Sequence, residues 1–309
     1  MPLDPQVQGL LNEFAAIGGP PIHELSVEDA RAVSEEMKAM SGEPIEVGSV
    51  HDITIPVDGA EIGARVYSPP GPGPHPVVMF FHGGGWVICS LDTHDNLARE
   101  ICRDAEAVVV SVDYRMAPEH RYPTAAHDCF AATNWVADNA ASLGADASRL
   151  AVCGNSAGGN LSAVVSQMAR DGGGPTISYA ALIYPAVDMT RKGGSLDENA
   201  SGYFLETDGM YWFMNHYITE TERSETMASP LLHADLAGLP DCFIATCEYD
   251  PLRDEGEAYG DALRADGVHV ESKRYDGLIH GAANMTGVLE GGRRLVADVA
   301  AHLRKALHR

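Results

Sequence analysis

The sequence predicts an α/β fold built on a mostly parallel sheet. Short apolar runs alternate along the chain with stretches of helical periodicity, and the runs themselves are almost continuously apolar. Strands that helices bury on both faces have this composition, whereas strands with one solvated face alternate between apolar and polar residues. The alternation of strand and helix indicates a doubly wound sheet. The apolar runs span residues 77–81, 107–112, 150–153, 179–184 and 242–247.

The chain before the first of these runs has a different pattern. Residues 1–48 are amphipathic and predict N-terminal helices, of which residues 27–40 form the clearest segment with Ser26 as N-cap. Residues 51–67 contain two alternating segments around an Asp-Gly pair, which predicts a β-hairpin.

The rest of the chain continues the alternation with one interruption. A long span between two buried strands exceeds what a crossover needs and contains a cluster of aromatic residues. We therefore expect an inserted cap over residues 188–228, packed with the N-terminal helices, and a catalytic domain made of residues 49–187 and 229–309. A helix pair without contact to substrate is the alternative for the insertion. Helices are expected over residues 93–104, 124–141, 157–170, 252–266 and 287–307, and a last strand over residues 268–275.

Composition and charge exclude several classes of function. The 309 residues are 45% hydrophobic and 21% charged, as in globular proteins, and carry a formal net charge of −23. Such an acidic chain is a poor partner for nucleic acid or for anionic membranes. No apolar run is long enough to span a bilayer and the first residues lack a signal-peptide pattern, so a cytoplasmic location is expected. The six cysteines form no Cys-x-x-Cys pair and are interpreted as buried free thiols, with a catalytic cysteine as the less favoured alternative.

The most specific motif surrounds a serine. Residues 154–158 read Gly-Asn-Ser-Ala-Gly, directly after an apolar run and directly before a helical stretch. In this context the pattern predicts a sharp turn that exposes the hydroxyl of Ser156 as a nucleophile. Because a hydroxyl is a weak nucleophile at neutral pH, the site then needs a base, an acid that orients the base, and donors for an oxyanion.

Candidate donors for the oxyanion follow the first buried strand. Residues 82–86 read His-Gly-Gly-Gly-Trp, and glycines leave backbone N–H groups uncovered. This loop type acts together with the N–H of the residue that follows the nucleophile. The backbone amides of Gly83, Gly84 and Gly85, with that of Ala157, are therefore the candidate oxyanion donors.

The acid and the base are expected at the carboxyl ends of the last two strands, where sites of open α/β sheets form. Asp250 ends a buried strand and is the preferred acid, with Glu248 as its rival. Asp254 and Glu255 are interpreted as charges in the first turn of the next helix. His280 lies between glycines after the last strand and is the preferred base.

Two other groups of polar residues have less specific interpretations. His82 is expected to brace the glycine loop from behind, in preference to acting as a second base. Residues 113–123 carry charges that are expected to form ion pairs, in preference to a metal or acid–base site. The sequence contains no zinc-binding or nucleotide-binding motif, so neither a metal nor a cofactor is expected.

Taken together and in order, these motifs resemble the bacterial hormone-sensitive lipase family of carboxylesterases. The resemblance implies an α/β-hydrolase fold with an eight-stranded sheet, a helical cap that includes the N-terminus, and hydrolysis of short- to medium-chain acyl esters through an acyl-enzyme. It also implies Ser156 as nucleophile, Asp250 as acid and His280 as base, and a homodimer through the last strand, as many relatives form. The matching motifs are residues 82–86, 113–120, 154–159, 250–254 and 277–281.

Three positions depart from the family pattern. Asn155 stands where aspartate is frequent, Cys89 where glycine is usual, and Ala282 where phenylalanine is common. All three changes are expected to matter little to the chemistry, which they can only tune. The third is expected to widen one wall of the pocket.

The substrate and the leaving group are less constrained than the chemistry. Trp212 and Phe213 of the cap, with Trp86 after the glycine loop, are expected to line an apolar acyl pocket. An amidase, a deacetylase or a lactonase would use the same three residues. A ligand receptor that has lost catalysis is a further alternative, disfavoured because His280 is present.

Overall fold

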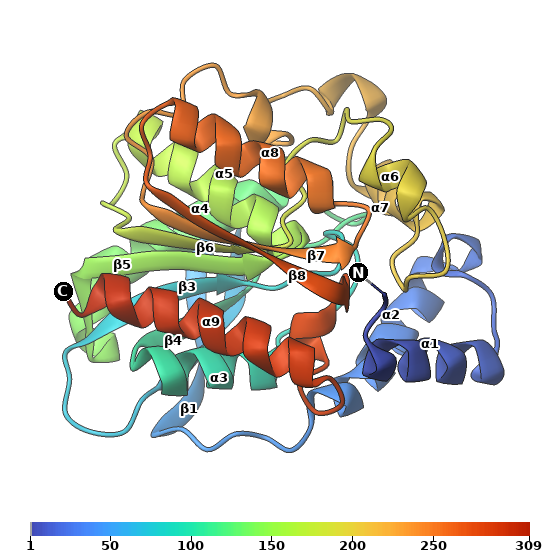
Figure 1. Ribbon diagram of the computed structural model, residues 1–309. Coiled ribbons are helices and arrows are strands. Elements are labelled where there is room, and N and C mark those ends of the chain that lie inside the picture. The colour runs from blue at the N-terminus through green and yellow to red at the C-terminus, as the bar shows by residue number, and fades with distance from the viewer. Residues whose placement is uncertain (1) are drawn as a thin grey trace.

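Eight strands form one sheet at the centre of the computed structural model, which describes residues 2–309 (Figure 1). The strands are β1 (Ser49–Val57), β2 (Ala60–Ser68), β3 (His75–Phe81), β4 (Val108–Asp113), β5 (Ala145–Asn155), β6 (Tyr179–Ile183), β7 (Cys242–Tyr249) and β8 (Val270–Ile279). Their order in the sheet is β1-β2-β4-β3-β5-β6-β7-β8. β2 is antiparallel to β1 and β4, and all other neighbouring strands are parallel. The mostly parallel, eight-stranded sheet that the sequence predicts is confirmed.

Helices cover both faces of this sheet and one of its ends. The α-helices are α1 (Pro5–Ile17), α2 (Val27–Glu36), α3 (Asp95–Ala105), α4 (Thr124–Asn139), α5 (Ala157–Gly172), α6 (Ser195–Glu198), α7 (Thr207–Tyr217), α8 (Arg253–Ala265) and α9 (Glu290–Leu307). Short 3-10 turns are η1 (Ile22–Glu24), η2 (Met37–Ser41), η3 (Ala140–Leu143), η4 (Glu220–Glu222), η5 (Pro230–Leu232) and η6 (Ala282–Asn284). α4, α5 and α8 lie on one face, and α3 and α9 lie on the other (Figure 1).

The remaining helices gather beyond the carboxyl ends of the parallel strands (Figure 1). There α6 and α7, from the segment between β6 and β7, lie on the same side as α1 and α2. The side chain of Ile22 in η1 lies against Gly209 of α7, so the two groups are in contact. Within residues 2–309, no helix combines the length and the apolar composition that crossing a bilayer requires.

The core explains why the central strands are continuously apolar. Along β3, Val77, Met79 and Phe81 belong to the apolar cluster on one face of the sheet. Val78 and Phe80 belong to the cluster on the opposite face. Successive side chains of a strand point to opposite faces, and here both faces are covered, so every position of β3 after His75 is buried.

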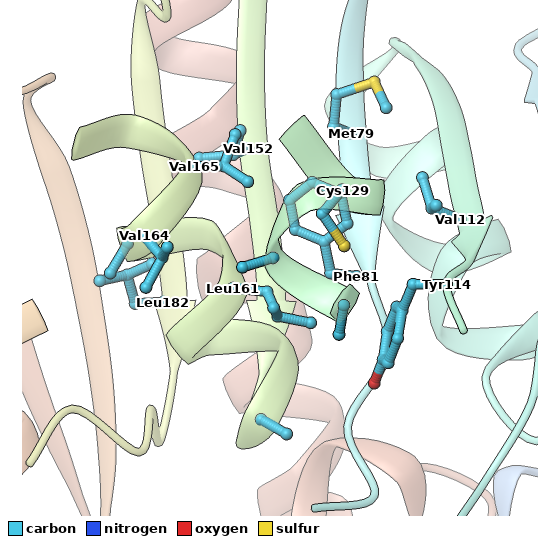
Figure 2. Packing of buried hydrophobic residues seen from close by; sticks show 14 of the residues in the cluster. Met79, Phe81, Val112, Tyr114, Cys129, Val152, Leu161, Val164, Val165 and Leu182 are labelled. Atoms are coloured by element: carbon cyan, nitrogen blue, oxygen red, sulfur yellow. The ribbon is translucent and has the colours of Figure 1, made fainter. Parts of the chain in front are cut away.

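Side chains of the first cluster interlock between the sheet and two helices (Figure 2). Val152 of β5, Leu161 and Val165 of α5, and Cys129 of α4 all point into the same layer. This packing holds α5 against the strand that precedes it. The turn between β5 and α5, which contains Ser156, is therefore supported on both sides.

β5 and β8 extend beyond their predicted bounds, each for an identifiable reason. β5 begins at Ala145, before the apolar run, because its first residues pair with the start of β3 ahead of a register shift. β8 continues to Ile279, past the Asp-Gly pair at residues 276–277, and its pairing with β7 is irregular near Cys247. Sequence alone placed the end of this strand at residue 275, which is wrong.

The N-terminal part agrees with the predicted pattern. Val57 pairs with Ala60 across the tight turn of the predicted hairpin. Ser26 caps α2 by accepting the backbone N–H of Asp29 at 3.1 Å. α2 is shorter than expected, because the chain tightens into the 3-10 turn η2 after Glu36.

Candidate active site

The strand-to-helix turn exposes Ser156 at the carboxyl end of β5. Its backbone has φ 56° and ψ −118°, which an L-residue rarely adopts. The N–H of Ser156 donates to the carbonyl of Ile183 on the neighbouring strand at 2.8 Å, which anchors the turn to the sheet. A strained turn of this kind presents the serine hydroxyl above the sheet edge.

Three predicted residues meet at this edge through hydrogen bonds. Ser156 Oγ lies 2.9 Å from His280 Nε2, and His280 Nδ1 lies 2.8 Å from Asp250 Oδ2. Asp250 is fully buried, and its other oxygen accepts the N–H of Leu252 at 2.8 Å. A histidine that donates from Nδ1 to a carboxylate accepts at Nε2, so the imidazole is oriented to receive the proton of the serine hydroxyl.

His280 is the first residue after β8 and is only 7% exposed. The ring of Tyr184, which follows β6, packs against its imidazole with centroids 4.6 Å apart. Glu248, the rival acid, accepts the N–H of Gly277 at 2.8 Å. The carboxylate bonded to His280 is that of Asp250.

The glycine loop after β3 offers two uncommitted amides. The N–H of Gly83 donates to the side-chain oxygen of Asn155 at 3.0 Å and is therefore occupied. Within residues 2–309, no acceptor is bonded to the N–H of Gly84 or of Gly85. Ala157 is the first residue of α5, where backbone N–H groups have no partner inside the helix. The amides open to a substrate oxygen are thus those of Gly84, Gly85 and Ala157.

Two buried histidines support this loop from behind. His82 is completely buried, stacks on Tyr114 with centroids 4.3 Å apart, and donates from Nδ1 to the carbonyl of Gly83 at 2.7 Å. Burial lowers the pKa of His82 to about 4. Burial also holds the pKa of His94 well below its ordinary value, and its Nε2 lies 3.2 Å from the N–H of Gly83. Both rings are therefore neutral near pH 7.

Helix α7 packs directly against the glycine loop. Gly85 has φ 58°, and a Cβ at this position would lie 2.3 Å from the ring of Phe213 in α7. Trp86 stacks on Tyr217, also of α7, with centroids 4.5 Å apart. Trp212 packs edge-on against Phe213. Only a glycine at position 85 allows the ring of Phe213 in α7 to lie this close to the loop backbone.

A small cavity of about 20 Å³ lies between α7 and the start of α8. Trp86 is part of its lining, whereas Trp212 and Phe213 are not. The lining is largely apolar, but Asp188, Arg191 and Glu255 also border it. Its principal apolar residues are Trp86, Ala186, Met189, Leu196, Met210 and Met214.

Glu255 was not recognised from the sequence as a structural carboxylate. It lies in the first turn of α8 as expected, but it is only 3% exposed, and it accepts the N–H groups of Val187 at 2.7 Å and Asp188 at 3.2 Å. Burial raises the pKa of Glu255 to about 8. The helical spacing of the apolar residues Leu252 and Tyr259 could have revealed this, because Glu255 falls on the same stripe.

The charges of residues 113–123 form ion pairs with neighbouring helices. Arg115 binds Asp128 of α4 through two nitrogens, at 2.9 and 2.7 Å. Glu119 binds Arg31 of α2 through both of its oxygens, at 2.8 and 2.7 Å. The segment therefore ties the N-terminal helices to the catalytic side of the sheet.

The positions that depart from the family pattern differ in what surrounds them. Ala282 is fully buried within the apolar cluster between the sheet, α3 and α9, so its methyl group faces packed side chains. Cys89 has φ 71°, a conformation that glycine adopts readily, and burial raises the pKa of its thiol to about 12. All six cysteines are free thiols.

The fold and the hydrogen-bonded Ser–His–Asp arrangement are those of a hydrolase built on an α/β sheet. A family model described as the alpha/beta hydrolase fold matches residues 78–284. The chain therefore belongs to the α/β-hydrolase family, as the resemblance to the hormone-sensitive lipase family predicts.

Characterised relatives and solved structures are similar over nearly the whole chain. Carboxylesterase NlhH of Mycobacterium tuberculosis is 42% identical, over 99% of this chain and 97% of the relative. A hyperthermophilic esterase from Pyrobaculum calidifontis is 42% identical, with a TM-score of 0.93 over 99% of both chains. An α/β-hydrolase enzyme from the metagenome of Lake Arreo is 38% identical, with a TM-score of 0.96 over 99% of both chains.

Proposed function

We propose that this protein is a serine carboxylester hydrolase that cleaves short- to medium-chain acyl esters through an acyl-enzyme. The observation that carries the proposal is the continuous hydrogen-bonded chain from the hydroxyl of Ser156 through His280 to the buried carboxylate of Asp250. The carboxylesterase and esterase names of the similar proteins support the same substrate class.

In this mechanism the hydroxyl of Ser156 attacks the ester carbonyl while Nε2 of His280 takes its proton. The carboxylate of Asp250 keeps the imidazole in the accepting tautomer and stabilises the imidazolium that forms. The tetrahedral intermediate collapses, and the alcohol leaves with the proton from His280. Water then repeats the same two steps on the acyl-enzyme and releases the carboxylic acid.

We propose the amides of Gly84, Gly85 and Ala157 as the oxyanion donors. The commitment of the Gly83 N–H to Asn155 argues against Gly83 in that role. Each such donor typically contributes about 3 kcal/mol to the stabilisation of the transition state.

The cap is proposed to limit the acyl group, with residues 1–48 and 188–228 forming it over a catalytic domain of residues 49–187 and 229–309. The contact of Phe213 with Gly85 places α7 directly beside the glycine loop, which supports a restricted acyl site and a preference for short acyl chains. Trp212 and Phe213 are proposed to act by holding α7 in place against the glycine loop. Replacing both with alanine is expected to move the optimum toward longer chains, and an unchanged optimum would contradict this role.

The test of the proposed function is hydrolysis of p-nitrophenyl esters from acetate to laurate. The wild-type protein is expected to be most active from two to about eight acyl carbons, and Ser156→Ala is expected to lose at least about 10⁴-fold in kcat. A fluorophosphonate probe is expected to label the wild type and not the variant. Folded protein without ester hydrolysis or labelling would favour a receptor that has lost catalysis.

The same panel distinguishes the related chemistries. Matched anilides, acetylated sugars and lactones would be cleaved at rates comparable to those of the esters by an amidase, a deacetylase and a lactonase respectively. For the proposed carboxylesterase, kcat/KM for the esters should exceed the others by about 100-fold or more.

Assembly and location are proposed on separate grounds. β8 is an edge strand, and a homodimer through this edge would pair the backbone groups that it exposes. Sedimentation at micromolar concentration tests the dimer. Six free, mostly buried cysteines fit a reducing cytoplasm, which cell fractionation tests.

A further inference from the structure

Asn155, the residue before Ser156, is the point where three loops of the site meet. It is 4% exposed, and its side-chain Oδ1 accepts the N–H of Gly83 at 3.0 Å. Its Nδ2 donates to the side-chain oxygen of Asn284 at 3.0 Å. Gly83 belongs to the glycine loop, and Asn284 ends the turn η6 that follows His280. A single amide group therefore joins the nucleophile, the oxyanion loop and the histidine loop.

The contacts of this amide are close on both sides. A Cβ at Gly83 would lie 2.7 Å from Nδ2 of Asn155, so the loop backbone packs closely against the side chain of Asn155. On the other side, the backbone N–H of Asn284 donates to the carbonyl of Gly281 at 2.9 Å, which places Asn284 in the same turn as His280. A displacement of Asn155 would therefore also displace the glycine loop and the loop that carries His280.

An amide fits this position because it donates and accepts at the same time. A carboxylate at position 155 would keep the bond from Gly83 but would have no proton for the oxygen of Asn284. Asn284 would then have to turn its own NH₂ group toward position 155. The two asparagines thus form a matched pair, in which at least one member must supply a donor.

We propose that Asn155 and Asn284 are positioning residues that set the distance between the oxyanion amides and the imidazole of His280. The inference rests on the proposed ester hydrolysis, since it assigns a role within that reaction. Negative charge develops beside the loop amides while positive charge develops on the imidazole. The bridge holds the groups that stabilise these two charges at a fixed separation.

The experiment is a cycle of aspartate substitutions followed by steady-state kinetics. Asn155→Asp and Asn284→Asp each leave one amide facing one carboxylate, so kcat is expected to fall by no more than about 5-fold in each. The double variant puts two carboxylates at hydrogen-bonding distance with no donor between them. If the two substitutions acted independently, the kcat of the double variant would be the wild-type kcat multiplied by the two single-variant ratios. At pH 8.5 its kcat is expected to lie at least about 30-fold below that value, with KM changed less than about 3-fold.

The pH profile distinguishes positioning by this pair from a general loss of structure. Two adjacent carboxylates share a proton as the pH falls, so the ratio of double-variant kcat to wild-type kcat is expected to rise about tenfold from pH 8.5 to pH 6. Dividing by the wild type removes the pH dependence that the two proteins share. The buried His82, His94 and Tyr184 remain neutral across this range, since burial lowers the pKa of both histidines and raises that of the tyrosine. Glu100, which accepts a hydrogen bond from Thr286 beside η6, is present in every variant, so it does not distinguish the variants from the wild type.

Two further variants serve as controls for the effect of the substitutions on folding and charge. Asn139→Asp in α4, where the side chain bonds only to its own helix, is expected to leave kcat unchanged. If the double variant does not fold, Asn284→Ala removes the bridge without adding charge and is expected to lower kcat about 5- to 10-fold at constant KM. Rates are expressed per site titrated with a fluorophosphonate.

Two results would overturn the proposal. The first is a double variant whose kcat equals the product of the single effects at every pH. The second is an Asn284→Ala variant with wild-type kcat. Either result requires a wild type that hydrolyses esters, so it is distinct from failure of the proposed function, in which the wild type and Ser156→Ala would be equally inactive.

Discussion

Replacing Glu255 with glutamine is expected to make the protein more stable at alkaline pH. The carboxyl is buried under the chain that follows β6, and burial raises its pKa from about 4.5 in an unfolded chain to about 8. Between these values the folded state holds a proton that the unfolded state has lost. Stability therefore falls as the pH rises through this window, because the unfolded state binds fewer protons.

The size of this effect follows from the width of the window. Each pH unit costs about 1.4 kcal/mol while the group is protonated in the folded state alone. From pH 4.5 to pH 8 this amounts to at most about 5 kcal/mol, and to about 3 kcal/mol at pH 7. Glutamine keeps a carbonyl acceptor for the N–H of Val187 and carries no charge. Its NH₂ group needs acceptors of its own, so we expect a net gain of about 2–4 kcal/mol at pH 8.5.

Urea unfolding at pH 5, 6.5 and 8.5 measures this difference. Glu255→Gln and the wild type should be nearly equal at pH 5 and should diverge as the pH rises. Glu257→Gln, two residues away and half-buried beside Arg274, is the matched control, and it should change the free energy of unfolding by less than about 1 kcal/mol. A glutamine variant less stable than the wild type at pH 8.5 would refute the reasoning, because it would mean that the two backbone amides stabilise an ionised carboxylate.

Other predictions follow from the loop, the N-terminal helices and the net charge. Gly85→Ala should lower kcat/KM at least about 100-fold, because its Cβ would collide with Phe213 and displace an oxyanion amide; an equally active variant would exclude this donor. Arg31→Ala should lower the free energy of unfolding by about 2 kcal/mol in urea, because the guanidinium bonds the carbonyls of Val87 and Ala117 as well as the exposed carboxylate of Glu119. Raising NaCl from about 0.05 to 0.5 M should raise Tm at pH 8 by several degrees, because salt screens the repulsion within a chain of net charge −23. At pH 5, near the pI of 4.8, the same salt should change Tm little.

Much of the fold could be read from local patterns that depend on burial alone. The continuous apolar runs became strands because helices cover both faces of the sheet, as at Val78 and Met79 of β3. The Asp-Gly turn of the hairpin and the Ser26 cap are likewise local, since a few neighbouring residues determine them. The end of β8 was missed because an irregularity in its pairing with β7 allows the strand to continue past a glycine.

In the site, too, the identity of the residues could be predicted from local patterns, but their arrangement could not. Ser156, Asp250 and His280 could be nominated because each follows a strand, and the carboxyl ends of parallel strands share one edge. The distances between these three side chains could not be predicted, because they depend on how three loops fold back over that edge. Glu255 was misjudged for a related reason: an acid in a first turn is usually solvated, and only the orientation of α8 about its axis turns this one inward.

The three oxyanion-loop glycines show what decides between equivalent residues in a motif. Sequence gives Gly83, Gly84 and Gly85 the same freedom, yet their amides cannot all point to a substrate, because a buried N–H must have an acceptor. The N–H of Gly83 donates to the side chain of Asn155, seventy-two residues later in the chain and adjacent to the nucleophile, and also lies near Nε2 of His94. Under the proposed assignment of the oxyanion donors, Asn155 occupies one amide and fixes the orientation of the loop that presents the other two. A position beside the nucleophile that takes no part in bond breaking can therefore control the geometry in which the bond breaks.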